Sequence, residues 1–277
     1  MQLFSPDGLT WLTVAFYLLA TLAGIVGYIC ANARLRAWGA WLAVASFLGQ
    51  TLILIFGFHK LLPEGLSLGA YLQLLAWFAL LCGIGAWLRL RQDAILLFAA
   101  PFALILFLLS AAWLDLGIKL SGGLSAPFYA LHIGSLFLSL GLLALAFIAG
   151  VIFLFLEGRI KSKKTLGPMW ADLPALALLD RINAICAMAA FPLYTLGIIA
   201  GLLRAAPVFG ATFTGDPKEV ASLVIWVLLA LLFYMRLARG WQGRKPALLL
   251  CAIFLLSLFS LLIINVFLPT HHGVIHS

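Results

Sequence analysis

Five histidines are the side chains of this chain best suited to bind a metal: His59, His132, His271, His272 and His276. Imidazole nitrogen is a common protein ligand for transition metals and for haem iron. His132 lies in a long apolar run between Leu131 and Ile133, where an ionisable group is a candidate functional residue. The histidine set therefore predicts a metal or haem site with His132 as its first candidate.

Structural explanations for the same histidines stay open. Histidines near a membrane surface often serve as amphipathic anchors, and His271 and His272 lie in a polar tail that water can solvate. His276 is the second-last residue, where chain ends commonly fray. His132 fits these explanations least well, because its neighbours are apolar.

Other catalytic and metal-binding patterns are missing from the sequence. The four cysteines, Cys30, Cys82, Cys186 and Cys251, are far apart and form no CxxC pair, which argues against a zinc site or a thiol-exchange motif. The sequence contains no glycine-rich phosphate loop, no GxSxG and no HExxH motif. We therefore do not expect this chain to be an enzyme by itself.

The elements that position these residues are membrane helices. Hydrophobic residues make up 65% of the chain and charged residues 9%, against roughly 25% charged residues in soluble domains. About 20 apolar residues cross the hydrocarbon layer. This window predicts about eight spans, at about 10–31, 37–58, 67–88, 94–114, 127–155, 183–204, 218–236 and 246–268. We expect an all-α integral membrane protein, with one polytopic membrane domain over residues 1–277.

Basic residues predict the orientation of these spans. Alternate loops hold thirteen lysines and arginines: Arg34, Arg36, Arg89, Arg91, Arg159, Lys161, Lys163, Lys164, Arg181, Arg236, Arg239, Arg244 and Lys245. The other loops hold four: Lys60, Lys119, Arg204 and Lys218. The positive-inside rule then predicts both termini, and every histidine, at or near the non-cytoplasmic side. The basic residues that give the net charge of +8 set the topology and contact anionic lipid headgroups. The charge is thereby explained, and we expect no nucleic-acid partner.

One non-cytoplasmic loop, residues 209–220, combines aromatic and turn-forming residues. Asp216, Pro217 and Glu219 form a helix-start pattern, with Asp216 as the N-cap and Glu219 as its capping-box partner. Phe209 and Phe213 are separated by small residues. They would pack on a flat ligand or dip into the membrane interface, and the residues alone favour the purely structural explanation.

Several segments of the second half carry a resemblance to a known family. They include His132-Ile-Gly-Ser-Leu, Asp180-Arg-Ile-Asn183, the run from Asp216-Pro-Lys-Glu to Trp226, Arg239-Gly-Trp-Gln-Gly-Arg-Lys245, and the terminal Gly273-Val-Ile-His276. Together they resemble the cytochrome c assembly family of haem-handling membrane proteins, and more narrowly its CcsA/HemX-like branch. The resemblance covers roughly residues 125–277 and the first half mostly in its hydropathy.

The resemblance implies a function in cytochrome c maturation, with haem b bound or presented at the outer face of the bacterial inner (cytoplasmic) membrane. By position, His132 and His276 would be the axial ligands of the haem iron, and Phe209, Phe213 and Asp216 would line the site. The implied partners are a separately encoded cytochrome c maturation component or apocytochrome c. In that setting the chain would be at most one part of a haem-attachment system.

Two departures from the family pattern keep alternatives open. The family has tryptophans before the aspartate, where this chain has Phe209, Phe213 and Gly215. Larger family members have a second buried histidine pair, for which this chain offers His59 and has Tyr234 at the other position. One alternative is a HemX-like regulator or scaffold of tetrapyrrole synthesis acting through the basic cytoplasmic segments. A small-solute permease is disfavoured, because the spans contain few polar groups.

Overall fold

The structure is a computed structural model that describes residues 6–64, 68–112, 126–163, 173–209, 213 and 215–264. Within these residues it contains helices and no strands. In this described part of the chain, eight helices are long and apolar enough to cross a membrane. They are α1 (Pro6–Ile29), α2 (Ala33–Glu64), α3 (Leu68–Leu90), α4 (Ala94–Ala112), α5 (Ala126–Lys161), α7 (Leu176–Phe209), α8 (Pro217–Ala238) and α9 (Arg244–Phe259). The predicted all-α, multi-span membrane fold is confirmed.

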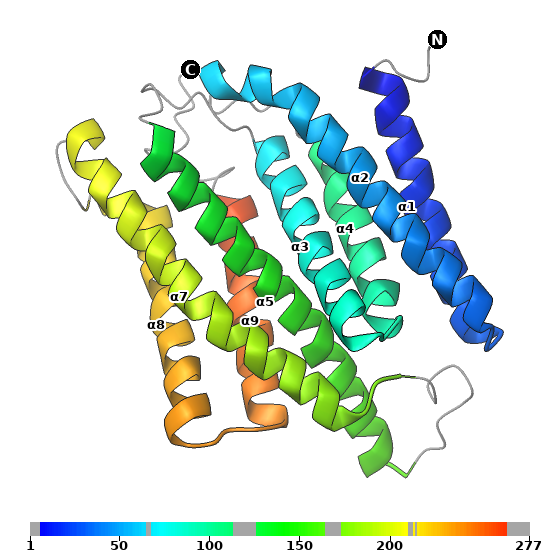
Figure 1. Cartoon of the computed structure of the whole chain (residues 1–277). Helices are drawn as coiled ribbons and strands as arrows, with labels where there is room; N and C mark the ends of the chain where they lie inside the picture. Colours follow the sequence, from blue (N-terminus) through cyan, green and yellow to red (C-terminus); the bar gives the residue numbers. More distant parts are fainter. Residues whose placement is uncertain are drawn as a thin grey trace.

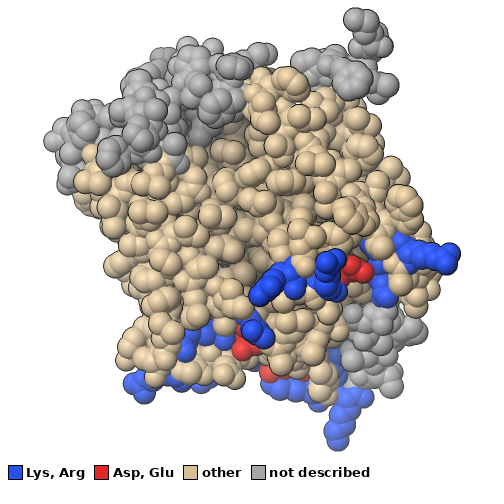
Figure 2. All heavy atoms as spheres, viewed as in Figure 1, with Lys and Arg blue, Asp and Glu red and all other residues tan. Residues whose placement is uncertain are grey.

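The helices lie side by side and run up and down in turn (Figure 1). The α1–α2, α3–α4 and α8–α9 connections therefore meet at one end, together with the end of α5 and the start of α7. Lysine and arginine side chains gather in the same, lower half of the molecule (Figure 2). We call this the basic end and the opposite one the His132 end. The positive-inside rule assigns the basic end to the cytoplasm, and this orientation stays a prediction.

Helix α5 is the central helix of the bundle. It packs against α3, α7 and α9, and 72% of its apolar span is buried, against 17% for α8. Its small residues allow close approach: a Cβ on Gly141 would lie 2.7 Å from the carbonyl oxygen of Phe78 on α3. Helices with small residues at their contact pack closely in membranes. Helix α5 therefore connects α3 on one side of the bundle with α7 and α9 on the other.

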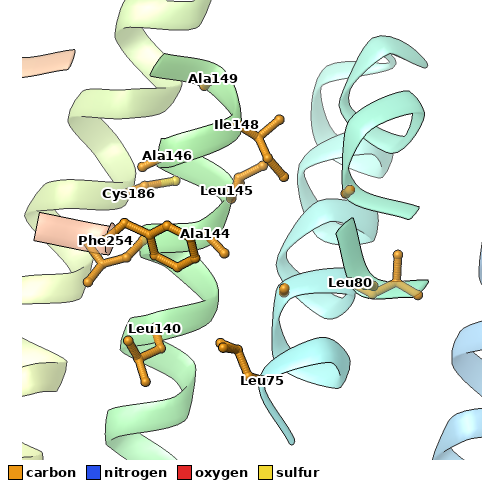
Figure 3. Close-up of a cluster of buried hydrophobic side chains, with 14 of the residues drawn as sticks. Leu75, Leu80, Leu140, Ala144, Leu145, Ala146, Ile148, Ala149, Cys186 and Phe254 are labelled. Carbon is orange, nitrogen blue, oxygen red and sulfur yellow. The ribbon is translucent and has the colours of Figure 1, made fainter. Parts of the chain in front are cut away.

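The buried core is built from aliphatic side chains on several helices. Figure 3 shows Leu140, Ala144 and Leu145 of α5 between Leu75 and Leu80 of α3 on one side and Phe254 of α9 on the other. Phe254 is fully buried and stacks at a tilt on Phe147, with ring centroids 5.0 Å apart. This interdigitation fixes the rotation of α5, and so fixes which of its residues face α7.

Helices α2, α5 and α7 are clearly longer than the hydropathy window predicts, and α2 covers Ala33–Glu64 where 37–58 is expected. Helix α5 continues past the predicted end near residue 155 to Lys161, and α7 begins at Leu176. By sequence, residues 173–181 are expected to form a short surface helix that leads into the sixth span, and in the structure the residues from Leu176 onward are the first turns of α7 itself. The side chain of Asp180 accepts a hydrogen bond from Arg236 on α8, and the side chain of Asn183 donates one to the Ala146 carbonyl on α5. These bonds hold the first turns of α7 against the bundle.

Candidate functional site

His132 lies in the second turn of α5 and packs directly against α7. Its Nδ1 is 2.6 Å from the carbonyl oxygen of Gly197. A carbonyl oxygen only accepts, so Nδ1 carries the proton and donates, and the lone pair of the neutral ring is on Nε2. Metal-ligating histidines are commonly oriented by such a bond from the other ring nitrogen. His132 is thus held in the tautomer that a metal needs.

Gly201 provides the space that the His132 ring occupies. A Cβ at Gly201 would lie 2.7 Å from Cε1 and 2.8 Å from Nδ1 of the imidazole. Gly197 and Gly201 are one helical turn apart in a GxxxG pattern, which brings helices together in membranes. The pattern explains how α7 both accepts the hydrogen bond and accommodates the ring.

The α5–α7 contact has further polar ties along its length. Ser139 Oγ donates to the carbonyl of Ala190 at 2.9 Å, and Asn183 Nδ2 donates to the carbonyl of Ala146 at 3.3 Å. With the His132 bond, these ties run from the His132 end to the basic end. The position of His132 is therefore set by a whole helix pair.

We expect Gly201→Ala to destabilise the protein by about 1–3 kcal/mol, because the added methyl group must displace the His132 ring. The matched control is Gly134→Ala on α5, since a Cβ at Gly134 meets nothing within 4 Å. Both substitutions replace a helical glycine with alanine, which favours the helix. SDS titration in mixed micelles measures the unfolding midpoint of each variant. The midpoint should fall for Gly201→Ala and should rise or stay unchanged for Gly134→Ala. Equal shifts would contradict the packing of His132 on Gly201.

The start of α8 is the second part of the His132 end. Asp216 is buried and caps the helix, with its Oδ1 accepting the backbone N–H of Lys218 at 2.8 Å. Pro217 is the first helical residue, and Gly215 forms the preceding turn with φ of 76°. The predicted N-cap is confirmed. Because its carboxylate holds the helix start, Asp216 supports the shape of the loop.

Lys218 connects this helix start to the centre of the bundle. Its Nζ lies 5.2 Å from the centroid of the Tyr71 ring on α3. Tyr71 in turn stacks on Phe137 of α5, with centroids 5.7 Å apart and planes at 14°. Phe137 follows His132 by little more than one turn. A cation over an aromatic face contributes about 0.5–2 kcal/mol, so this stack ties α8, α3 and α5 together near His132.

Sequence reasoning placed Lys218 in the 209–220 loop but gave it no role, and it did not identify Tyr71 as part of this region. The signal for Lys218 is its charge in the first turn of an apolar span, where ionisable residues are rare. Nothing in the sequence marks Tyr71, because its contact with Lys218 joins helices far apart in the chain. The GxxxG spacing of Gly197 and Gly201 is a signal that can be found from sequence.

The other predicted site residues are placed only in part. Phe213 is 48% exposed. Phe209 is the last residue of α7, and His59 lies within α2. For both residues the structure describes the backbone, and the side chains lie outside the description. His276 lies outside the described residues. Within the described part, the structure brings His132 and Asp216 to the same end, and no group of three or more metal-binding side chains is found there.

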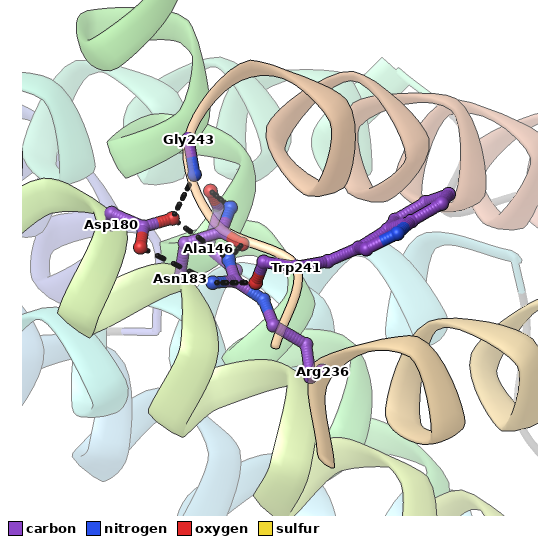
Figure 4. A network of polar contacts seen from close by, with 6 residues as sticks. All are labelled: Ala146, Asp180, Asn183, Arg236, Trp241 and Gly243. Carbon is purple, nitrogen blue, oxygen red and sulfur yellow. Dashed lines mark hydrogen bonds and ion pairs between the residues drawn. The ribbon is translucent and has the colours of Figure 1, made fainter. Parts of the chain in front are cut away.

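A second polar cluster lies at the basic end (Figure 4). Arg236 of α8 forms a two-pronged ion pair with Asp180 of α7, with N–O distances of 3.0 and 3.2 Å. Arg236 also donates to Asn183 Oδ1 at 2.7 Å and to the Trp241 carbonyl at 3.1 Å. The Arg236 and Asp180 side chains are 4% and 17% exposed. The charges are thus neutralised inside the protein.

This cluster also holds the α8–α9 turn. Asp180 Oδ1 accepts the backbone N–H of Gly243 at 3.0 Å, and Gly243 has φ of 74°, a conformation that favours glycine. Within the described residues, Arg236 Nε is buried without a hydrogen-bond partner. The cluster therefore joins α5, α7, α8 and α9, and its chemistry is that of a structural anchor.

Comparisons with known proteins point to one family. A family model described as "Cytochrome C assembly protein" matches residues 66–272. The cytochrome c biogenesis protein CcsA of Rippkaea orientalis is 43% identical over 77 residues, which cover 28% of this chain and 23% of the relative. CcsA of Nostoc sp. is 39% identical over 95 residues, or 34% and 26% of the two chains.

A solved structure, the cytochrome c haem lyase CcmF, has a similar fold, with a TM-score of 0.65 and 16% sequence identity. The match covers 92% of this chain and 46% of CcmF. The chain thus spans about half the length of that structure, and the matched segments span about a quarter of the CcsA relatives. The predicted resemblance to CcsA is confirmed, whereas its narrower HemX-like part receives no support from these comparisons.

Proposed function

The chain belongs to the cytochrome c assembly protein family, and from this premise we propose that it acts in cytochrome c biogenesis by binding haem at the His132 end of its bundle. The observation that carries the proposal is the orientation of His132. Its ring is fixed by the Gly197 carbonyl and by the space over Gly201.

His132 is suited to be an axial ligand of haem iron. Haem iron takes its remaining ligands from the porphyrin, so one or two protein side chains suffice, and a cluster of three or more is not needed. An imidazole with a protonated, hydrogen-bonded Nδ1 offers Nε2 to the iron. When bound, haem b would supply the porphyrin that an apocytochrome c receives, while residues of this chain bind and orient it.

The remaining residues of the proposed site follow from the family pattern. We assign His276 as the second axial ligand and Phe209, Phe213 and Asp216 as residues around the porphyrin, with His59 as a further candidate ligand. Phenylalanines would replace the family's tryptophans as apolar contacts for the porphyrin face. Asp216 would act by keeping the start of α8 in place, since its carboxylate caps the helix.

The proposal also sets the location and the partners. The chain would lie in the bacterial inner membrane with the His132 end outward, as the basic residues of the opposite end support. It would receive or hand over haem together with a separately encoded cytochrome c maturation component or apocytochrome c. The alternative of a regulator of tetrapyrrole synthesis depends on the HemX-like resemblance and has no separate observation in its favour.

The direct test is a haem titration of the full chain purified in detergent micelles. We expect a Soret band, distinct from that of haem in empty micelles, that saturates at about one haem per chain, as axial ligation by imidazole implies. Empty micelles and a membrane protein of similar size without histidines in its spans serve as controls. A spectrum identical to that of haem in empty micelles would reject haem binding.

A further inference from the structure

A surface at the basic end combines exposed arginines with exposed tryptophans. Arg34, Trp38 and Trp41 are on α2, and Arg89 and Arg91 follow at the end of α3; we call these five residues the Arg–Trp surface. Trp38 and Trp41 are 66% and 60% exposed, and the three arginines are exposed. None of them takes part in the His132 site, which lies at the opposite end of the bundle.

On α2 these residues begin a stripe of exposed side chains along one face of the helix. Arg34, Trp38 and Trp41 are four and three residues apart, the spacing of neighbours on a helix face. Two turns beyond Trp41, the same spacing of four and three recurs in the exposed Leu48, Leu52 and Ile55. The stripe thus passes from cationic to aromatic to aliphatic over about 30 Å, at 1.5 Å per residue. A phospholipid has the same order of phosphate, interfacial and acyl regions.

The end of α3 completes the surface. The ring of Trp41 meets that of Trp87 edge to face, with centroids 5.6 Å apart and planes at 87°. Trp87 is buried, and its Nε1 donates to Asp93 Oδ1 at 2.8 Å. Trp41 is therefore packed on a fixed partner. Because α3 ends one turn after Trp87, where the Arg91 N–H bonds to the Trp87 carbonyl, this contact joins the end of α3 to α2 at Trp41.

Arg91 has an unusual backbone conformation for an arginine. Its φ is 55°, in the left-handed region, and its N–H bonds to the carbonyl of Trp87 at 2.7 Å, ending α3. This helix-ending position is usually taken by glycine, which adopts it without steric strain. A charged side chain here comes at a conformational cost, and it places a third guanidinium at the same end of the surface.

We infer that the Arg–Trp surface is a binding site for one anionic phospholipid. Guanidinium groups bind phosphate oxygens in pairs, tryptophans favour the depth of the lipid headgroups, and the aliphatic stripe of α2 would hold an acyl chain. The neighbouring Arg36 lies over the Tyr28 ring, 4.9 Å from its centroid, and is directed to α1. Helix α2 precedes the part matched by the family model, residues 66–272, so three of the five residues of the surface are outside the matched part.

The test compares two charge-neutralised variants of the full chain. The first is Arg34→Gln/Arg89→Gln/Arg91→Gln. The control is Lys163→Gln/Arg181→Gln/Arg239→Gln, which removes the same charge from exposed positions at the same end. Each protein is placed in nanodiscs of phosphatidylcholine with increasing phosphatidylglycerol. Native mass spectrometry measures the phospholipid that stays bound, and circular dichroism checks that both variants are folded.

We expect the first variant to lose phosphatidylglycerol affinity about ten- to hundredfold, since each basic residue contributes about tenfold or less near an anionic surface. The control should keep the wild-type affinity. An equal loss in both variants would overturn the proposal in favour of general attraction to the charged surface, and retained affinity in the first variant would also overturn it. If the first variant fails to fold, Trp38→Ala/Trp41→Ala replaces it, and a smaller loss of bound lipid is expected. Unchanged lipid binding in this variant would contradict the proposed site.

Discussion

His132→Ala is expected to abolish the distinct, saturating Soret band that the wild-type chain gives with added haem, leaving the spectrum of haem in empty micelles, and free imidazole is expected to restore it. The reason is that the imidazole is the only part of the side chain that would ligate the iron, while its loss leaves a space between α5 and α7. The ring fills the volume over Gly201 and bonds to the Gly197 carbonyl. A free imidazole has the same shape and the same two nitrogens.

The imidazole rescue separates ligation from folding. A variant that loses haem binding because its helices rearrange would not regain it from a small ligand, whereas a vacated ligand site would. The measurement is the haem titration of His132→Ala with and without added imidazole, and the readout is saturation at about one haem per chain compared with haem and imidazole in empty micelles. Ser135→Ala is the matched control on α5, because Ser135 Oγ bonds only to carbonyls of its own helix among the contacts described, at Leu131 and His132. A full Soret band in His132→Ala without imidazole would rule out His132 as an axial ligand.

Much of this fold can be predicted from hydropathy, because the membrane allows few alternatives. In lipid, backbone groups must be bonded within a helix or a closed barrel, so each long apolar run becomes a helix. The same reasoning fails at the ends of helices. It stops α5 near residue 155 and starts the next span near residue 183. The reason is that hydropathy reports lipid contact, and charged residues interrupt the apolar runs between 157 and 161 and at Asp180 and Arg181.

The candidate site is predictable in part for a related reason. His132 stands out by type, since an imidazole in an apolar run needs an explanation. Its support by Gly197 depends on the rotation of α7 against α5, which is set by packing across the core. Likewise, Lys218 and Tyr71 meet only because α3 and α8 begin at the same end of the bundle. Such contacts between distant residues leave no local pattern in the sequence.

The largest loss of stability is expected from breaking the buried ion pair at the basic end. Arg236→Gln or Asp180→Asn should each destabilise the protein by about 3–5 kcal/mol, because either change leaves the partner's charge buried without compensation. Asp180→Asn also weakens the bond to the Gly243 N–H that holds the α8–α9 turn. SDS-titration unfolding in mixed micelles measures both effects, with the exposed Arg239→Gln as the control.

The double variant Asp180→Asn/Arg236→Gln distinguishes a charge effect from a loss of packing. When both charges are removed, no ion is left uncompensated, so its destabilisation should be smaller than the sum of the single ones. Additive effects would show that the pair does not interact as its 3.0 Å contact indicates. Asp180 and Gly197 share α7 but lie about 25 Å apart along it, at 1.5 Å per residue. The folded double variant should therefore keep the haem affinity of the wild type. This result would show that the ion pair stabilises the fold without contributing to haem binding.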